Sequence, residues 1–296
     1  MQDQIAIETR ARVLLDRANA WGRFPTPVED IMAAAKVRVA PKNAFDPASI
    51  LAFIKEKGEQ AINSFKSAIS KVLGLYDANE SIIHVDDTVS QSKQTFLKLH
   101  ETGHHEIPSH RKIFSVFQDC DKTLAPEIAD LFERQANNFA RFALFQGDAY
   151  KVRAADMEMS IKTPITLSKK FGASIYAAAR EFARTNHRSC VVYALEPMDG
   201  LGADVRRIEP SPLFRDQFGC PADTHINANH ALGVLLPFGQ QKMVKPTSLV
   251  YADKNGVKHE CLGESFKTTY NIFLLIYPTK ALTSSLIIVP TSYQGL

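Results

Sequence analysis

The chain has 296 residues, which is long enough to bury a full hydrophobic core and to form two domains. Its hydrophobic fraction of 45% and charged fraction of 23% are ordinary for a globular protein, and its net charge of +3 neither requires nor excludes a nucleic-acid partner. The four cysteines are widely spaced and form no C-x-x-C pair, which excludes a disulfide framework and a four-cysteine zinc ribbon.

The sequence predicts a cytoplasmic protein without a membrane partner. The N-terminal stretch MQDQIAIETRARVLLDRANA is charged throughout and lacks the long apolar region of a signal peptide. No stretch reaches eighteen consecutive apolar residues, so we expect no membrane-spanning helix. The cysteines are then expected to be free thiols in a reducing compartment.

The first part of the chain alternates between helical patterns and short β-like runs. Apolar residues at helical spacing predict helices, and short β-branched runs beside turn residues predict strands. In chain order we expect a helix over residues 5–20, a helix from residue 27, a strand over 37–40, a helix over 46–73 and a β-hairpin over 73–87.

The second part begins with long helical patterns, and near residue 188 the pattern becomes β-rich. We expect a helix over residues 88–105, a second long helix over 126–145, and two short helices over 163–185 joined at Gly172. From Arg188 onward the runs SCVVYAL, NIFLLIYP and SLIIVP are β-rich. The sequence therefore predicts an α+β protein with one domain over residues 1–187 and a β-rich accessory domain over residues 188–296.

The helix over 88–105 carries the pattern H-E-x-x-H at His100, Glu101 and His104. Residues four apart in a helix lie on one face, so the two histidines can direct ring nitrogens at one metal ion. Glu101 projects beside that face and can take a proton from an activated water. This combination predicts a zinc hydrolase in which two histidines bind the metal and the glutamate is the general base.

A catalytic zinc ion also needs a third protein ligand from another element. The helix over 126–145 offers Glu127, Asp130 and Glu133 along one edge. Glu133 precedes a surface of small and apolar residues that can pack closely on the first helix, so it is the first choice. Asp130 and Glu127 remain alternatives.

The sequence predicts the roles of several other residues less definitely. Gly103 costs about 1 kcal/mol relative to alanine inside a helix, which predicts close approach by a neighbouring element. His105 and His110 could hydrogen-bond a substrate or an oxyanion, or they could be solvated cations at a helix end. Tyr76 and Tyr150 could also assist a transition state, but their local sequence does not favour this role.

Several motifs together resemble the ImmA/IrrE family of zinc metallopeptidases. TPVEDIMAAAKVRV is similar to the family's opening helix and strand, and GLYDANESIIHVDD is similar to its hairpin. QTFLKLHETGHHEI resembles its F-x-x-x-H-E-x-x-H helix, ERQANNFARFAL its E-x-x-A-N-x-F-A helix, and LSKKFGASIYAAAREF its closing helical pair. The resemblance covers roughly residues 10 to 185, with an apparent helical insertion over 46–73.

The resemblance implies a zincin-like metallopeptidase fold for residues 1–187, and a role in sensing or substrate recognition for the β-rich accessory domain over 188–296. His100, His104 and Glu133 would bind zinc, and Glu101 would be the catalytic base. The ligand types also accept manganese. The implied activity is cleavage of a protein substrate, a helix-turn-helix transcriptional repressor that controls a stress response or a mobile element.

The residues leave two other functions open. The helical pair over 163–185 could be a helix-turn-helix, but its second helix presents Arg180 and few base-reading side chains, so DNA binding is not favoured. A regulatory DNA- or protein-binding module with a structural or vestigial metal site is the main alternative, and a hydrolase of small amides is the other. The cysteines and histidines after residue 188 fit no standard metal-ligand spacing.

Overall fold

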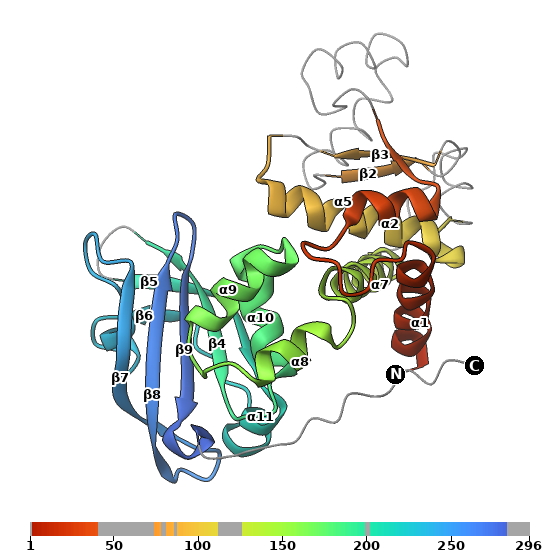
Figure 1. Ribbon diagram of the computed structural model, residues 1–296. Coiled ribbons are helices and arrows are strands. Elements are labelled where there is room, and N and C mark those ends of the chain that lie inside the picture. Colours follow the sequence, from red (N-terminus) through yellow and green to blue (C-terminus); the bar gives the residue numbers. More distant parts are fainter. Residues whose placement is uncertain are drawn as a thin grey trace. The chain divides into compact units, whose positions relative to one another are not determined.

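The computed structural model describes residues 2–40, 74–77, 81–85, 88–111, 126–198 and 202–282 (Figure 1). The chain divides into two compact units. The first unit comprises Met1–Gly147 and Lys170–Ala173, and the second comprises Asp148–Lys169 and Ser174–Leu296. None of the helices in the described ranges has the length and apolarity needed to cross a bilayer.

The first unit combines helices with a small three-stranded sheet (Figure 1). The sheet order is β1-β3-β2, with β1 parallel and β2 antiparallel to β3, which confirms the predicted hairpin. The helix expected over residues 46–73 lies outside the described residues. The elements are α1 (Gln2–Arg17), α2 (Val28–Ala35), β1 (Arg38–Val39), β2 (Gly74–Asp77), β3 (Ile82–Val85), α5 (Gln91–Glu106) and α7 (Pro126–Phe145).

Helix α5 lies at the centre of this unit, in contact with α2, α7 and the small sheet. Every residue from Leu99 to His105 is buried, so the second half of α5 is covered on all sides. Gly103 lies directly under Phe139 of α7, because a Cβ atom at Gly103 would be only 3.1 Å from the Phe139 Cδ1 atom. The close approach expected at Gly103 is confirmed, and it brings the two helix backbones together.

The opposing face of α7 repeats small and aromatic residues at helical spacing. Alanine at the contact positions lets α5 approach closely, while the phenylalanine rings fill the space between the helices. The buried residues of this stripe are Phe132, Ala136, Phe139, Ala140 and Ala143.

The second unit holds a six-stranded antiparallel sheet of order β6-β5-β4-β9-β8-β7. Its helices are α8 (Ala149–Ala155), α9 (Lys162–Phe171, of which the last two residues belong to the first unit), α10 (Ile175–Thr185) and α11 (Pro212–Phe218), with short 3-10 turns η1 (Gly233–Leu235) and η2 (Thr279–Leu282). Its strands are β4 (Val191–Pro197), β5 (Gly202–Pro210), β6 (His225–Asn227), β7 (Met243–Ala252), β8 (Lys258–Lys267) and β9 (Ile272–Pro278).

Both faces of this sheet are covered, which explains the continuous apolar runs of β4 and β9. On one face, Tyr193 and Leu274 pack in a core with Phe214 of α11. On the other face, Phe273 contacts Tyr176 of α10, with the ring centroids 6.4 Å apart.

The packing of α10 also bears on the domain boundary. We predicted the boundary between residues 187 and 188, where the strands begin. The contacts instead group residues 148–169 and 174–187 with the sheet, because α10 packs on β4 and β5. The α+β class is confirmed: the chain combines a helix-rich unit with a unit built on an antiparallel sheet.

Candidate metal centre

The H-E-x-x-H pattern lies on a helix, as predicted, and occupies the buried half of α5. His100 and His104 are one turn apart, and their Nε2 atoms approach to 3.1 Å. The exposed fractions of the two residues are 8% and 3%. Both ring nitrogens therefore converge on one point at the face of α5.

Glu133 of α7 supplies a carboxylate to the same point. Its Oε2 atom is 3.2 Å from the His100 Nε2 atom, and its Oε1 atom is 3.5 Å from the His104 Nε2 atom. Within the described ranges, this trio is the only group of histidine, cysteine and carboxylate side chains that could hold a metal ion. Asp130 and Glu127, the alternatives for the third ligand, are not part of it.

The geometry of the three donors fits a zinc ion. Ligand atoms about 2.1 Å from a tetrahedral zinc ion lie about 3.4 Å from one another. The observed separations of 3.1 to 3.5 Å bracket that value. Two imidazoles and one carboxylate are also a donor set that catalytic zinc sites use. The Glu133 side chain is 57% exposed, so solvent reaches the group.

The charges around the group are strongly coupled. The neighbouring imidazoles of His100 and His104 hold the pKa of Glu133 well below its usual range. Burial lowers the pKa of His100, but Glu133 and Glu101 act against it, and the net pKa is raised. The carboxylate therefore stays ionised at neutral pH and offers its negative charge to a cation.

Glu101 is almost completely buried, with 5% of its surface exposed. Burial raises its pKa, and the neighbouring His100 and His104 act in the opposite direction. A carboxyl group of raised pKa beside a metal site suits proton transfer at neutral pH, because it can both accept and return a proton.

Hydrogen bonds from α7 and from His110 support the outer nitrogens of both histidines. The Nδ1 atom of His100 is 3.2 Å from Asn137 Oδ1, and that of His104 is 3.0 Å from His110 Nδ1. His110 is fully buried, and its Nε2 atom is 2.7 Å from Gln135 Oε1. Sequence reasoning missed Gln135 and Asn137, although both follow Glu133 on the same helix.

The other residues singled out from the sequence have different surroundings. Neither His105 nor His110 is solvated; His105 is buried and hydrogen-bonds the backbone of Ala35. Burial lowers the pKa of His110 to about 4. Tyr150 belongs to the second unit, where its hydroxyl donates to the Ala178 carbonyl at 2.6 Å. The side chain of Tyr76 lies outside the described residues.

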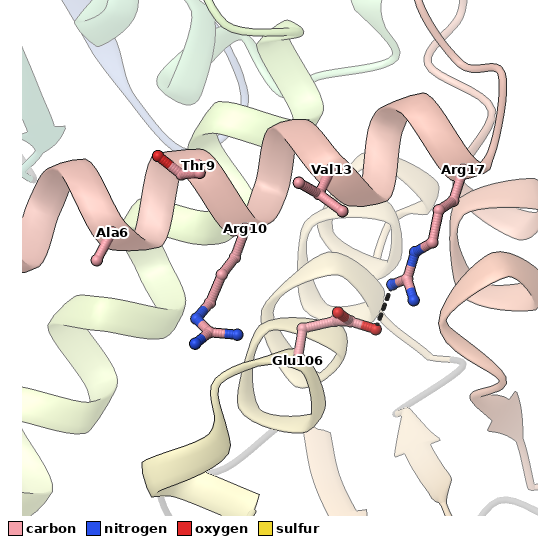
Figure 2. A pocket seen from close by; sticks show the side chains of 6 residues that line it. All are labelled: Ala6, Thr9, Arg10, Val13, Arg17 and Glu106. Carbon is pink, nitrogen blue, oxygen red and sulfur yellow. Dashed lines mark hydrogen bonds and ion pairs between the residues drawn. The ribbon is translucent and has the colours of Figure 1, made fainter.

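A surface hollow of about 420 Å³ lies beside the C-terminal end of α5 (Figure 2). An ion pair of 2.7 Å between Arg17 and Glu106 crosses it and ties the end of α1 to the end of α5. The hollow is lined by Ala6, Thr9, Arg10, Val13, Arg17 and Glu106. None of the three candidate ligands His100, His104 and Glu133 lines this hollow.

The structure does not support the helix-turn-helix interpretation of α9 and α10, because α10 lacks an exposed face that could read DNA. Every residue of α10 is buried or half-buried. Arg180 and Arg184 both donate to Glu209 of β5, at 3.1 and 2.9 Å. These arginines are thus engaged inside the second unit and do not offer a basic surface to DNA.

The cysteines and histidines of the second unit do not form a second metal group within the described ranges. Each of the three histidines after residue 188 instead pairs with an aspartate, at 2.8 to 3.2 Å. Cys190 and Cys261 are buried thiols, and Cys220 is exposed. The histidine pairs are His225 with Asp204, His230 with Asp223, and His259 with Asp253.

The comparisons with known proteins find similarity at the level of structure. No family model and no curated protein matches the chain. Among solved structures, the chain is similar to a Mycobacterium tuberculosis transcriptional regulator, with a TM-score of 0.54 and 12% sequence identity. The match covers 96% of this chain and 93% of that one. At this identity the similarity shows a related fold.

Proposed function

We propose that this chain is a zinc-dependent endopeptidase of the ImmA/IrrE type, with a zincin-like first unit. The observation that carries the proposal is the convergence of His100, His104 and Glu133, whose donor atoms lie 3.1 to 3.5 Å apart. The resemblance of the motifs to that family names the same three residues as ligands.

The residues around the group have matching chemical roles. A bound zinc ion supplies Lewis acidity, which makes water a nucleophile at neutral pH and polarises a peptide carbonyl. Glu101 accepts the proton of the attacking water and returns it to the leaving nitrogen. Its burial keeps its pKa raised, which favours both steps of this transfer. Glu133 adds the negative charge that two neutral imidazoles lack.

The substrate we propose is a protein, namely a helix-turn-helix repressor of a stress response or a mobile element. The exposed Glu133 side chain places the group where a polypeptide can reach it. The family resemblance supports the repressor class. A link with transcription also agrees with the name of the Mycobacterium tuberculosis structure.

The name of that structure also favours a second candidate function. In this alternative the chain is a regulatory module that binds DNA or protein, and its metal site is structural. The engagement of Arg180 and Arg184 with Glu209 argues against DNA binding through α10. Protein binding through another surface stays open in this alternative.

A cleavage experiment separates the two candidates. The zinc-loaded protein is incubated with the helix-turn-helix repressors of its cell, and fragments are identified by mass spectrometry. Glu101→Gln should retain zinc and lose cleavage by about 10²- to 10⁴-fold, the contribution of a general base. Glu106→Gln, at the end of the same helix, is the matched control and should cleave normally.

Two results would decide against the peptidase. Cleavage by Glu101→Gln at the normal rate would remove Glu101 from the mechanism. Tight binding of a repressor without any fragment, unchanged by Glu101→Gln, would instead support the regulatory module.

A further inference from the structure

The hydrogen bonds behind His104 form a directed chain that ends on α7. His104 Nδ1 lies 3.0 Å from His110 Nδ1, and His110 Nε2 lies 2.7 Å from Gln135 Oε1. The His110 ring also stacks on Phe132, with the ring centroids 4.0 Å apart and the planes inclined by 20°. The stacking orients the His110 ring between His104 and Gln135.

The chemistry at each end of this chain determines where the protons lie. A side-chain amide oxygen accepts hydrogen bonds and cannot donate one, so His110 Nε2 must carry a proton toward Gln135. A neutral His110 then has a lone pair on Nδ1, and His104 Nδ1 must donate to it. His104 Nε2 is left with its lone pair, which faces His100 and Glu133.

If the hydrogen bonds ran in the opposite direction, His104 could not bind a metal ion. If the Gln135 amide nitrogen faced His110, the protons would shift by one position along the chain. His104 would then carry its proton on Nε2, where a metal ion must bind. Only the direction that starts from the amide oxygen is compatible with metal binding by His104.

We propose that His110, oriented by Gln135 and Phe132, is a positioning residue that holds His104 in the tautomer able to bind the metal ion. The inference rests on the proposed zinc site for the identity of the metal, but the tautomer itself belongs to the protein without metal. Helix α7 would thus supply Glu133 as a ligand and also set the tautomer of a ligand on α5.

Burial makes this arrangement costly to disturb. His110 is 0% exposed, and His104 is 3% exposed, so water cannot replace a lost partner easily. His110→Leu removes the acceptor and keeps an apolar side chain against Phe132. His110→Asn places an amide oxygen near the former Nδ1 position and so keeps an acceptor for His104.

The first measurement is the tautomer of His104 in the metal-free protein, by long-range ¹H–¹⁵N NMR with labelled histidine. The wild type should carry the proton on Nδ1, and so should His110→Asn. His110→Leu should shift His104 toward the form protonated on Nε2. A His104 signal that is unchanged in His110→Leu would overturn the inference.

The second measurement is zinc affinity, by competition with a chromophoric chelator. Loss of a hydrogen-bond partner of a metal-binding histidine typically weakens affinity 10- to 100-fold. His110→Leu should show a loss in that range, and His110→Asn should stay near the wild type. An equal loss in both folded variants would point to packing alone and would overturn the positioning role.

Gln135→Leu keeps the test decisive if His110→Leu does not fold, because Gln135 is only half-buried. It should change the His104 tautomer in the same direction, while Arg134→Leu, at an exposed position next to it, should not. A wild type that binds no zinc but holds His104 protonated on Nδ1 would refute the proposed function and leave the positioning role supported.

Discussion

Glu133 is the residue on which the metal centre depends most, because it is the member of the converging group that comes from α7. Glu133→Gln keeps the size of the side chain and removes its charge. Zinc affinity should then fall by roughly 100-fold or more, beyond the usual effect of losing a hydrogen-bond partner of a ligand. Equilibrium dialysis with metal analysis measures the loss.

Asp130→Asn is the matched control for this prediction. Asp130 lies one turn before Glu133 on the same helix and was an alternative third ligand, but it is not part of the converging group. The control should retain wild-type zinc affinity. A loss in Asp130→Asn that equals the loss in Glu133→Gln would contradict the assignment of the third ligand.

The sequence could predict the converging residues but not their supporting partners. His100 and His104 share a helix face by spacing alone, and the expected packing of α7 on α5 favours Glu133 over Asp130 and Glu127. The contacts of Gln135, Asn137 and His110 depend on ring orientation and on the register between two helices. Local patterns do not encode these quantities, so His110 could only be listed with two open alternatives.

At the scale of elements, the contact between Gly103 and Phe139 shows how α5 and α7 form one unit. The missing side chain at Gly103 lets the Phe139 ring lie against the backbone of α5. The helix-propensity cost of the glycine predicted such an approach, although it could not say which residue fills the space. The approach brings Glu133 within reach of the histidines.

The attachment of α10 to the sheet depends on Glu209 of β5. Burial raises the pKa of Glu209, but Arg184 and Arg180 outweigh this effect, and the net pKa lies below its ordinary value. A lowered pKa means that the stabilisation is present above the unfolded-state pKa of about 4.3 and is lost as the pH falls through the folded-state value.

Glu209→Gln should therefore lower the free energy of unfolding at pH 7 by about 2 kcal/mol, as expected for hydrogen bonds to a charged group. Denaturant titrations at several pH values measure the difference between wild type and variant. The difference should shrink as the pH falls from 7 toward 3. A difference that is constant over this range would contradict the role of the ionised carboxylate.

At the scale of the whole molecule, hydrophobic periodicity predicted the secondary-structure class of each part of the chain. It predicted the boundaries between the two compact units less well. The α+β class and the β-rich texture after residue 188 followed from hydrophobic patterns. The grouping of α10 with the sheet did not, because it depends on contacts of Tyr176, Arg180 and Arg184 with distant strands. The same contacts removed the reading face that a helix-turn-helix would need.

The proposed peptidase function requires that zinc binds His100, His104 and Glu133 in the first unit. Trp21 is the only tryptophan in the sequence and belongs to that unit, so tryptophan fluorescence reports its unfolding. A ligand that binds only the folded state at 100 times its Kd stabilises that state by about 2.7 kcal/mol.

Denaturant unfolding followed by Trp21 fluorescence, with and without zinc, is therefore the most direct measurement. Zinc at that concentration should raise the free energy of unfolding of the wild type by about 2.7 kcal/mol and leave His100→Ala unchanged. An unfolding midpoint that zinc does not move in the wild type, or moves equally in His100→Ala, would contradict the metal centre.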